Sequence, residues 1–254
     1  MSSTEREFEI ARNKGIYVFA KKSLNYIKQK SKFLFLFYAI FKIKTFKYNN
    51  NLNITLNFAF NGLWGVIKPF QIYEEILELL KILNEEEPRV VLEIGTANGG
   101  TLFLFSRAAS KDATLISVDL PKGMFGGGYP IWKIPLYKSF ALSNQKIHLI
   151  RADSHTKSTL ERVKSILNGK EIDFLFLDGD HTYEGVKKDF EMYSPLVKNG
   201  GIIAFHDIVP GPGELVGGVP EFWREIKDKY NTREIVKDWG QGGYGIGVIY
   251  KSRV

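Results

Sequence analysis

Val90-Val91-Leu92-Glu93-Ile94-Gly95-Thr96-Ala97-Asn98-Gly99-Gly100-Thr101 is the stretch that decides the fold. Its first five residues are typical of a buried strand, which runs into a turn of small residues and then into a helix. Such a turn lets backbone N–H groups approach a nucleotide-like ligand, because no side chains stand in the way. Any tight strand-to-helix turn favours glycine, however, so the turn alone is weak evidence.

Asp119 supplies the second signal. It ends the next apolar run, residues 114–118, and lies about 20 residues beyond the turn. At that spacing a carboxylate reaches ribose hydroxyls in a nucleotide-binding βαβ unit. Glu93 precedes Gly95 by two residues, a place from which it can face a positively charged group. Together these residues favour a nucleotide-type ligand over a purely structural turn.

Composition limits the possible classes of protein. The chain of 254 residues is long enough for one α/β domain with an N-terminal extension. It contains no Cys, which excludes disulfides, Cys-ligated metals and a cysteine nucleophile. This agrees with a reducing compartment, and the cytoplasm is the expected location.

The positive charge is concentrated at the N-terminus. Residues 1–50 hold 11 Lys/Arg against 3 Asp/Glu, whereas the other residues hold 24 against 25. We expect residues 1–68 to form a basic, aromatic-rich helical extension and residues 69–254 to form the main domain. Phe33–Phe41 is an apolar run of nine residues, far short of the ~20 that span a bilayer. A helix within residues 16–48 can lie on an anionic membrane surface. The favoured alternative is a helix that packs on the main domain or on a partner subunit, as in a homo-oligomer.

Strand and helix patterns alternate after the extension, which indicates a mostly parallel sheet covered by helices. A glycine-rich turn near the C-terminus joins the last two strands, so we expect the sheet to finish in an antiparallel hairpin. The expected strands are 89–94, 114–118, 147–151, 172–177, 202–205, 234–236 and 244–250, and the expected helices are 70–83, 157–167, 183–197 and 219–230.

Polar residues stand at the carboxyl ends of all five central strands. In an open α/β sheet these ends gather on one rim, where ligands bind. Chance or helix capping explains one or two such residues, whereas five together indicate a functional site. They are Glu93, Asp119, Asp153 with Ser154, Asp178 with Gly179-Asp180-His181, and His206 with Asp207.

These motifs, in this order, resemble class I S-adenosylmethionine-dependent methyltransferases. Within that superfamily residues 70–250 are similar to the cephalosporin-hydroxylase-like and sugar or macrolide O-methyltransferases, and more distantly to catechol O-methyltransferase. The resemblance implies a Rossmann-like seven-stranded sheet with the C-terminal hairpin. It also implies S-adenosylmethionine as the cofactor. The motifs are residues 92–100, 117–119, 151–154, 176–181 and 205–207.

Carried over residue by residue, the resemblance assigns the cofactor contacts. The turn formed by Gly95, Thr96, Ala97, Asn98, Gly99 and Gly100 would hold the methionine portion. Asp119 would bind the ribose, Asp153 and Ser154 would contact the adenine edge, and Glu93 would lie near the amino group. Asp178 also borders this site.

The resemblance further implies a divalent metal held by Asp178, His206 and Asp207. His206 departs from the usual acid or amide, and hard Mg²⁺ prefers oxygen ligands, so a softer ion and no metal both stay open. A neutral hydroxyl needs a base or a metal to become nucleophilic. His181, three residues after Asp178, is the first candidate base, and His206 is the second. Alternatively, His181 only starts the following helix and bonds to Asp180.

Two glycine-rich segments can surround the acceptor, namely residues 125–132 and 210–218. The expected function is O-methylation of a small-molecule, sugar or glycan hydroxyl. An NAD(P)-dependent oxidoreductase is the nearest alternative, but Ala97 stands where the second glycine of G-x-G-x-x-G belongs. A nucleic-acid methyltransferase lacks its amino-methylation motif here, so nucleic acid is not the expected partner. A non-enzymatic membrane-associated binding module is the third alternative.

Overall fold

The computed structural model describes residues 31, 33–47, 51–123 and 127–252. The chain divides into two compact units, Met1–Thr45 and Phe46–Val254. In the first unit residues 33–45 are helical, as expected, and the helical prediction for residues 1–30 falls outside the described residues. Within the described part of the chain, no helix has the length and apolar character needed to cross a membrane.

The second unit begins earlier than the expected boundary at residue 69. Helix α2 (Leu52–Asn61) contacts α3 (Tyr73–Glu86) and α4 (Gly100–Ala108). The Phe58 ring packs against Phe103 of α4 with ring centroids 5.5 Å apart, and Phe46 packs against Phe58 at 4.4 Å. Aromatic burial of this kind joins residues 46–68 to the main domain.

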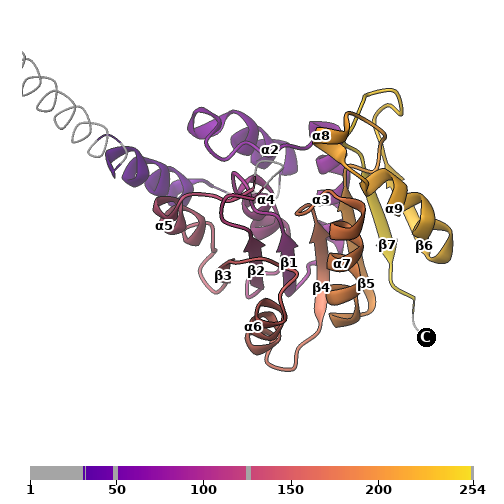
Figure 1. Ribbon diagram of the computed structural model, residues 1–254. Helices are drawn as coiled ribbons and strands as arrows, with labels where there is room; N and C mark the ends of the chain where they lie inside the picture. The colour runs from indigo at the N-terminus through magenta and orange to yellow at the C-terminus, as the bar shows by residue number, and fades with distance from the viewer. Residues whose placement is uncertain (1–30, 32, 48–50, 124–126, 253–254) are drawn as a thin grey trace, which may run out of the picture. The chain divides into compact units, whose positions relative to one another are not determined.

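A seven-stranded sheet forms the centre of this unit (Figure 1), in the order β3-β2-β1-β4-β5-β7-β6. Only β7 runs antiparallel to its neighbours β5 and β6, so the expected parallel sheet with a C-terminal antiparallel hairpin is confirmed. The strands are β1 (Val90–Ile94), β2 (Thr114–Asp119), β3 (Lys146–Arg151), β4 (Ile172–Leu177), β5 (Val197–His206), β6 (Asn231–Ile235) and β7 (Ile246–Tyr250).

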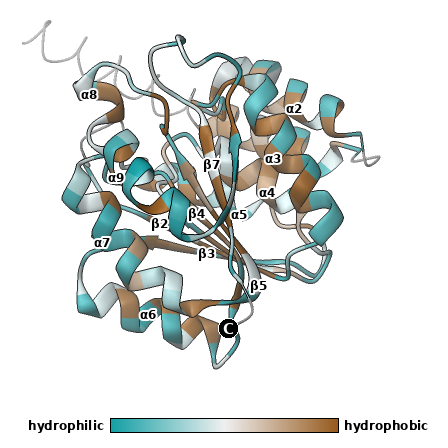
Figure 2. Ribbon diagram, turned by 90° about the vertical axis from the view of Figure 1, so that its right-hand side faces the viewer, coloured by the Kyte–Doolittle hydropathy of each residue, from teal (hydrophilic) through white to brown (hydrophobic). Residues whose placement is uncertain are grey.

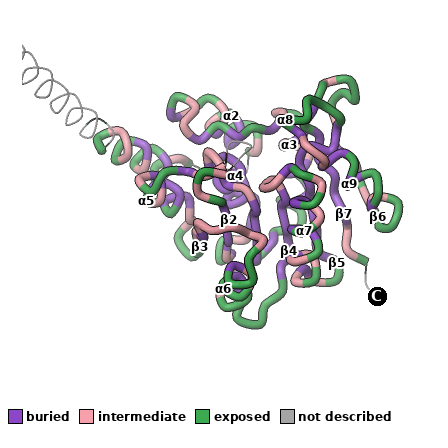
Figure 3. The backbone as a smooth tube through the Cα atoms, in the orientation of Figure 1, coloured by how far each residue is buried: buried purple, intermediate pink, exposed green. Residues whose placement is uncertain are grey.

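Helices cover both faces of the sheet. Figure 2 shows α2, α3, α4 and α5 (Ile134–Lys138) on one side and α6, α7 and α9 on the other. Helices α6 (Lys157–Leu167), α7 (Tyr183–Tyr193) and α9 (Val219–Ile226) close the second face, and short α8 (Gly213–Val216) lies beyond the end of β5. Because both faces are covered, the central strands are mostly apolar. All five residues of β1 are buried (Figure 3).

Several element ends differ from the sequence expectation. Helix α7 stops at Tyr193, and a 3₁₀ turn at Ser194–Leu196 continues toward β5. The connection after β2, expected to be a loop, contains a 3₁₀ turn at Ile131–Lys133 and α5. Strands β6 and β7 are displaced from the expected ranges, which lengthens their connection to residues 236–245. Proline at the start of α5 hides a short helix from periodicity arguments.

Glu75 on α3 binds the connection between β6 and β7 to the rest of the domain through hydrogen bonds. Its side chain is only 1% exposed. Oε1 accepts hydrogen bonds from the Lys237 backbone N–H at 3.0 Å and from Gln241 Nε2 at 2.8 Å. Oε2 accepts from the Gly245 backbone N–H at 2.9 Å. A buried carboxylate with three donors stabilises a loop that has little apolar surface of its own.

Replacement of Glu75 should therefore destabilise the domain. We expect Glu75→Ala to lower the free energy of unfolding by about 3 kcal/mol, because three buried donors lose their acceptor. Glu74→Ala is the matched control: Glu74 is exposed and pairs with Lys237 at 2.7 Å, an interaction that solvent screens. Urea unfolding of both variants measures the difference. Equal losses in the two variants would contradict the role assigned to Glu75.

Candidate active site

The turn after β1 is shaped by a close approach of two strand ends. Gly95 has φ of 94°, and a Cβ there would lie 1.9 Å from the Asp178 carbonyl oxygen. Only glycine fits, for both reasons. Gly99, with φ of 80°, precedes α4, and a Cβ on it would lie 2.6 Å from the Tyr137 ring. The small residues of this turn are thus required by packing, and the same packing leaves its backbone accessible from the sheet rim.

Asp119 at the end of β2 binds the backbone of this turn. Oδ2 accepts hydrogen bonds from the N–H groups of Thr96 at 2.9 Å and Ala97 at 2.7 Å. Oδ1 accepts from Gly128 N–H at 2.5 Å. Burial raises the pKa of the Asp119 carboxyl above its ordinary value, and these three donors oppose the rise. Ala97 has φ of 41°, so it adopts the left-handed conformation that glycine would take more readily.

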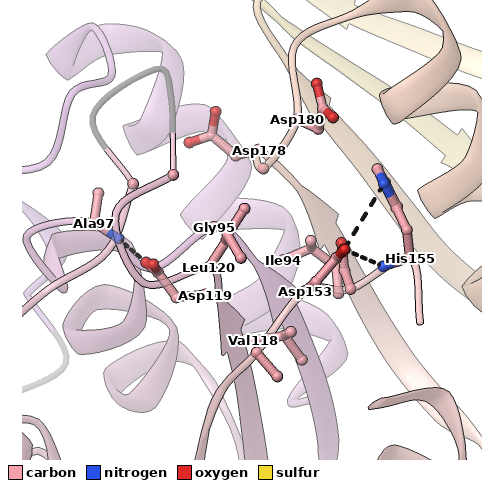
Figure 4. A pocket seen from close by; sticks show the side chains of 15 residues that line it. Ile94, Gly95, Ala97, Val118, Asp119, Leu120, Asp153, His155, Asp178 and Asp180 are labelled. Carbon is pink, nitrogen blue, oxygen red and sulfur yellow. Dashed lines mark hydrogen bonds and ion pairs between the residues drawn. The ribbon is translucent and has the colours of Figure 1, made fainter. Parts of the chain in front are cut away.

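A pocket opens between the turn and the ends of β2, β3 and β4. Its empty volume, which includes space open to solvent, is about 800 Å³. Figure 4 shows Asp119, Asp153 and Asp178 around it, with Asp153 bonded to His155. The lining residues are Ile94, Gly95, Ala97, Val118, Asp119, Leu120, Gly123, Gly127, Ala152, Asp153, Ser154, His155, Asp178, Gly179 and Asp180.

The structure therefore brings together six of the residues that the sequence predicted for cofactor binding: Gly95, Ala97, Asp119, Asp153, Ser154 and Asp178. Other predicted contacts lie beside the pocket and do not line it. Thr96 Oγ1 hydrogen-bonds Ser117, and Asn98 Oδ1 accepts from Lys133 Nζ at 3.3 Å. Gly99 and Gly100 begin α4. Of the two glycine-rich segments, the first includes residues 125 and 126, which lie outside the described residues.

Glu93 is a buried carboxylate with one unsatisfied oxygen. The residue is 0% exposed, and Thr101 Oγ1 donates to its Oε1. Its Oε2 is buried without a hydrogen-bond partner. Burial raises the pKa of Glu93 to about 8, and the nearby Asp178 and Asp119 charges contribute to the rise. An unpaired buried carboxylate oxygen is costly, so this oxygen fits a site where a cationic group would bind.

Asp178 links the pocket to a second group of side chains. Its Oδ2 accepts a hydrogen bond from Gln71 Nε2 at 2.9 Å, and its Oδ1 lies 3.0 Å from His206 Nδ1 and 3.4 Å from His181 Nε2. Asp207 Oδ2 is 3.3 Å from Nδ1 of each histidine. Burial alone would raise the pKa of Asp178, but His206 and His181 outweigh burial and hold it well below its ordinary value. Asp178, His181, His206 and Asp207 are called the His–Asp cluster below.

The two histidines of this cluster have different environments. His181 uses both ring nitrogens, since Nδ1 also lies 2.5 Å from the Leu215 carbonyl. His206 is 4% exposed, and its Nε2 is buried without a hydrogen-bond partner. Burial opposes protonation of both rings, but Asp178 and Asp207 outweigh burial and raise the pKa of each histidine. Of the two rings, His206 therefore keeps a nitrogen free for another molecule.

The same cluster contains a set of metal-ligand atoms. Among the described residues, one atom each from Asp178, His181 and Asp207 lie within 4.8 Å of one another. The sequence placed His206, not His181, in this set. Imidazole and carboxylate together suit a transition-metal ion better than Mg²⁺, which prefers oxygen ligands. The metal site at this rim stays a prediction, with His181 as a further candidate nitrogen ligand.

Sequence reasoning missed two neighbours of the cluster. Gln71 precedes α3, and its Oε1 is buried without a partner. Tyr244 donates its backbone N–H to Asp207 Oδ1 at 3.0 Å, and its ring centroid lies 6.0 Å from that of His206. Tyr244 and Asp207 both have positive φ, 61° and 63°. The sequence signal for Tyr244 was its place among glycines, Gly-Gly-Tyr-Gly. Such a segment favours unusual backbone angles, and residues with such angles cluster at functional sites.

A family model matches the part of the chain that forms this site. Residues 92–208, less than half of the chain, match the family described as a methyltransferase domain. That segment runs from β1 to the end of β5 and contains the glycine turn, the pocket and the His–Asp cluster. Residues 92–208 thus resemble a methyltransferase domain.

Curated relatives match over part of their length. An uncharacterised protein, R132, of Acanthamoeba polyphaga mimivirus is 32% identical over 140 residues, covering 55% of this chain and 61% of that protein. Tapetum-specific methyltransferase 1 of Arabidopsis thaliana is 31% identical over 129 residues, covering 50% of this chain and 48% of that protein. The aligned region thus spans roughly half to three fifths of these relatives.

Solved structures share the fold. The O-methyltransferase TomG from Streptomyces achromogenes, in complex with SAM, has a TM-score of 0.53 at 16% identity, with 84% of this chain and 94% of that chain covered. An O-methyltransferase from Bacillus cereus, in complex with SAH, has a TM-score of 0.53 at 17% identity, with coverage of 82% and 93%. The seven-stranded Rossmann-like fold expected from the sequence is confirmed.

The raised pKa of Glu93 predicts a pH dependence of stability. The pKa of its carboxyl has the ordinary glutamate value of 4.5 in the unfolded chain and rises to about 8 in the folded protein. Between these values the folded state holds a proton that the unfolded state has released, so stability should fall as the pH rises through this window. Without ligand, we expect the free energy of unfolding to decrease from about pH 5 to pH 8, and Glu93→Gln to flatten this slope.

Urea unfolding at several pH values measures the effect. Glu161→Gln serves as the control, because Glu161 lies on α6 with its side chain 56% exposed. The control should keep the wild-type slope. An unchanged slope in Glu93→Gln would mean that Glu93 titrates as an ordinary carboxyl.

Proposed function

We propose that this protein is an S-adenosylmethionine-dependent O-methyltransferase that acts on a hydroxyl of a sugar, glycan or other small molecule. One observation carries the proposal: the pocket of the methyltransferase domain meets, at Asp178, a buried cluster of two histidines and two carboxylates. Methyl transfer to oxygen needs a cofactor pocket and, beside it, a group that can accept the proton of the acceptor hydroxyl. The solved structures that share this fold include O-methyltransferases.

The cofactor residues follow from the pocket. Gly95–Gly100 would hold the methionine portion, with Asp119 at the ribose and Asp153 with Ser154 at the adenine. The unsatisfied Glu93 Oε2 would receive the cofactor's amino group, directly or through water. A cation beside Glu93 would stabilise its ionised form, which burial otherwise disfavours.

The acceptor chemistry is assigned to the His–Asp cluster. Methyl transfer is an in-line displacement at a sulfonium methyl, so the acceptor oxygen must lose its proton as the new bond forms. His206 Nδ1 lies 3.0 Å from Asp178, which orients the ring and leaves Nε2 for the acceptor hydroxyl. Because Asp178 and Asp207 raise the pKa of His206, Nε2 accepts this proton only in the neutral ring, a form whose population grows as the pH rises. Because Nε2 is buried, the acceptor reaches it only if neighbouring groups move.

A divalent ion would supply a second way to activate the hydroxyl, by lowering its pKa. Asp178, His181 and Asp207 would hold it, whereas the sequence analysis named Asp178, His206 and Asp207. With His181 as a ligand, His206 stays free to position the acceptor. This division of roles gives each histidine a separate function and explains why the site has two.

The alternative functions have less support. An NAD(P)-dependent oxidoreductase would leave the His–Asp cluster without a role. For a nucleic-acid methyltransferase the main domain carries no excess of positive charge, with 24 Lys/Arg against 25 Asp/Glu after residue 50. A binding module without enzymatic activity would transfer no methyl group from labelled S-adenosylmethionine to any acceptor in a panel of sugars, glycans and phenols.

Loss of Asp119 should weaken cofactor binding. Asp119→Ala removes the proposed ribose acceptor and the three backbone contacts that shape the turn, so we expect the Kd for S-adenosylhomocysteine to rise by at least about tenfold, measured by calorimetry. Asp112→Ala is the control, since Asp112 is exposed and bonds only Ser110 at 2.7 Å. An unchanged Kd in Asp119→Ala would remove the ribose assignment, and tight NADH binding with no S-adenosylhomocysteine binding would favour an oxidoreductase.

Loss of His206 should slow transfer without weakening cofactor binding. Once an acceptor is found, we expect His206→Ala to reduce kcat by roughly a hundredfold or more, the usual contribution of a general base. His148→Ala on β3 is the control and should keep wild-type activity. Full activity in His206→Ala with loss in His181→Ala would move the base to His181. Treatment with EDTA adds a second arm, because activity that is lost and then restored by Mn²⁺ would assign hydroxyl activation to the metal.

A further inference from the structure

The helix over residues 33–45 exposes an unusual amount of apolar surface. Five large side chains within nine residues are exposed, by 42% to 70%. Two of them, Phe33 and Phe37, stack edge to face with ring centroids 4.7 Å apart. These five residues are called the aromatic stripe below: Phe33, Leu34, Phe37, Tyr38 and Phe41.

The stripe occupies one side of the helix. At about 100° per residue, the five side chains fall within an arc of about 140°. Lys44 projects within this arc, and Lys42 stands at its edge with Nζ 5.6 Å from the Tyr38 ring centre. Both lysines are exposed. The opposite side of the helix is also apolar but is buried or half-buried, so the stripe is the apolar surface that the helix exposes. An exposed apolar stripe with lysines beside it suits a helix that lies in the plane of a membrane surface.

Charge decides what kind of partner suits the stripe. Between Glu9 and Glu74 the chain has 11 Lys/Arg and not one Asp or Glu. A second copy of this helix would bring lysines against lysines, which opposes self-association. A nucleic-acid duplex offers its phosphates to the lysines but would leave the aromatic stripe in water. An anionic lipid surface satisfies both features, because aromatic rings enter the interface while lysines remain among the headgroups.

We propose that the helix over residues 33–45 binds an anionic membrane surface through the aromatic stripe, with Lys42 and Lys44 at the headgroups. The described part of the helix, residues 33–45, is about 20 Å long, which is shorter than the hydrocarbon core, and we expect it to lie along the surface. The proposal concerns the first unit alone and is independent of the methyl acceptor. It assigns a membrane contact to the part of the basic extension that the structure describes.

Vesicle flotation of the full chain tests this proposal. We expect the protein to float with vesicles made of equal parts of phosphatidylcholine and phosphatidylserine, and much less with phosphatidylcholine alone. Phe37→Ser and Phe41→Ser should each lower the partition coefficient by about tenfold, because each removes one apolar side chain from the interface. Lys42→Gln and Lys44→Gln should each lower it by about fivefold, and added salt should have the same effect.

Matched controls separate the stripe from surface apolarity and charge in general. Trp239→Ser removes a side chain that is 53% exposed in the second unit, close to the 58% of Phe37. Lys157→Gln and Lys170→Gln remove exposed lysines from the second unit. All three should float as the wild type does, and circular dichroism confirms that each variant is folded.

Three outcomes would overturn the proposal. The first is a wild-type protein that does not float with the anionic vesicles. The second is flotation that is unchanged in Phe37→Ser and Phe41→Ser. The third is a dimer, seen by analytical ultracentrifugation without lipid, that these two variants dissociate while no form binds vesicles, because the stripe would then be a surface between copies of this chain.

Discussion

The contact between the ends of β1 and β4 is the constraint on which the site depends. Gly95 lies so close to Asp178 that a Cβ would come within 1.9 Å of the Asp178 carbonyl. The Asp178 N–H donates to the Ile94 carbonyl at 2.9 Å, and Gly95 N–H donates to Val118 at 2.9 Å. These contacts place the glycine turn, which borders the pocket, directly beside the first member of the His–Asp cluster. One side chain at position 95 would separate the two halves of the site.

The cluster itself places four ionisable groups in a region with little water. Removing charges from water is costly unless they pair, and here each carboxylate faces both histidines. Gln71, Leu215 and Tyr244 add hydrogen bonds from three different segments of the chain. The loop that carries Tyr244 is in turn held by the buried Glu75. Buried carboxylates therefore act in both places: Glu75 stabilises the domain, and Asp178 and Asp207 fix the geometry of the site.

Most of the fold could be predicted because its signals are local. Apolar runs such as Ile172–Leu177 mark strands buried on both faces, and Thr156 at the start of α6 is a local cap whose side chain accepts from Thr159 N–H at 3.3 Å. Helix α5 could not be predicted, since a five-residue helix has too few turns to show a period. The boundary of the main domain was also hidden, because residues 46–61 join it through aromatic contacts that no local pattern records.

The sequence by itself determined the order of strands and helices, the glycine turn, and which acids and histidines end the strands. Those features depend on residues near one another in the chain. Tertiary structure alone decided that His181 has both nitrogens engaged while His206 keeps Nε2 unpaired, and that Gln71 and Tyr244 belong to the same cluster. The physical reason is that these partners come from segments 34 to 107 residues apart in the chain, and their distances exist only once the sheet has formed.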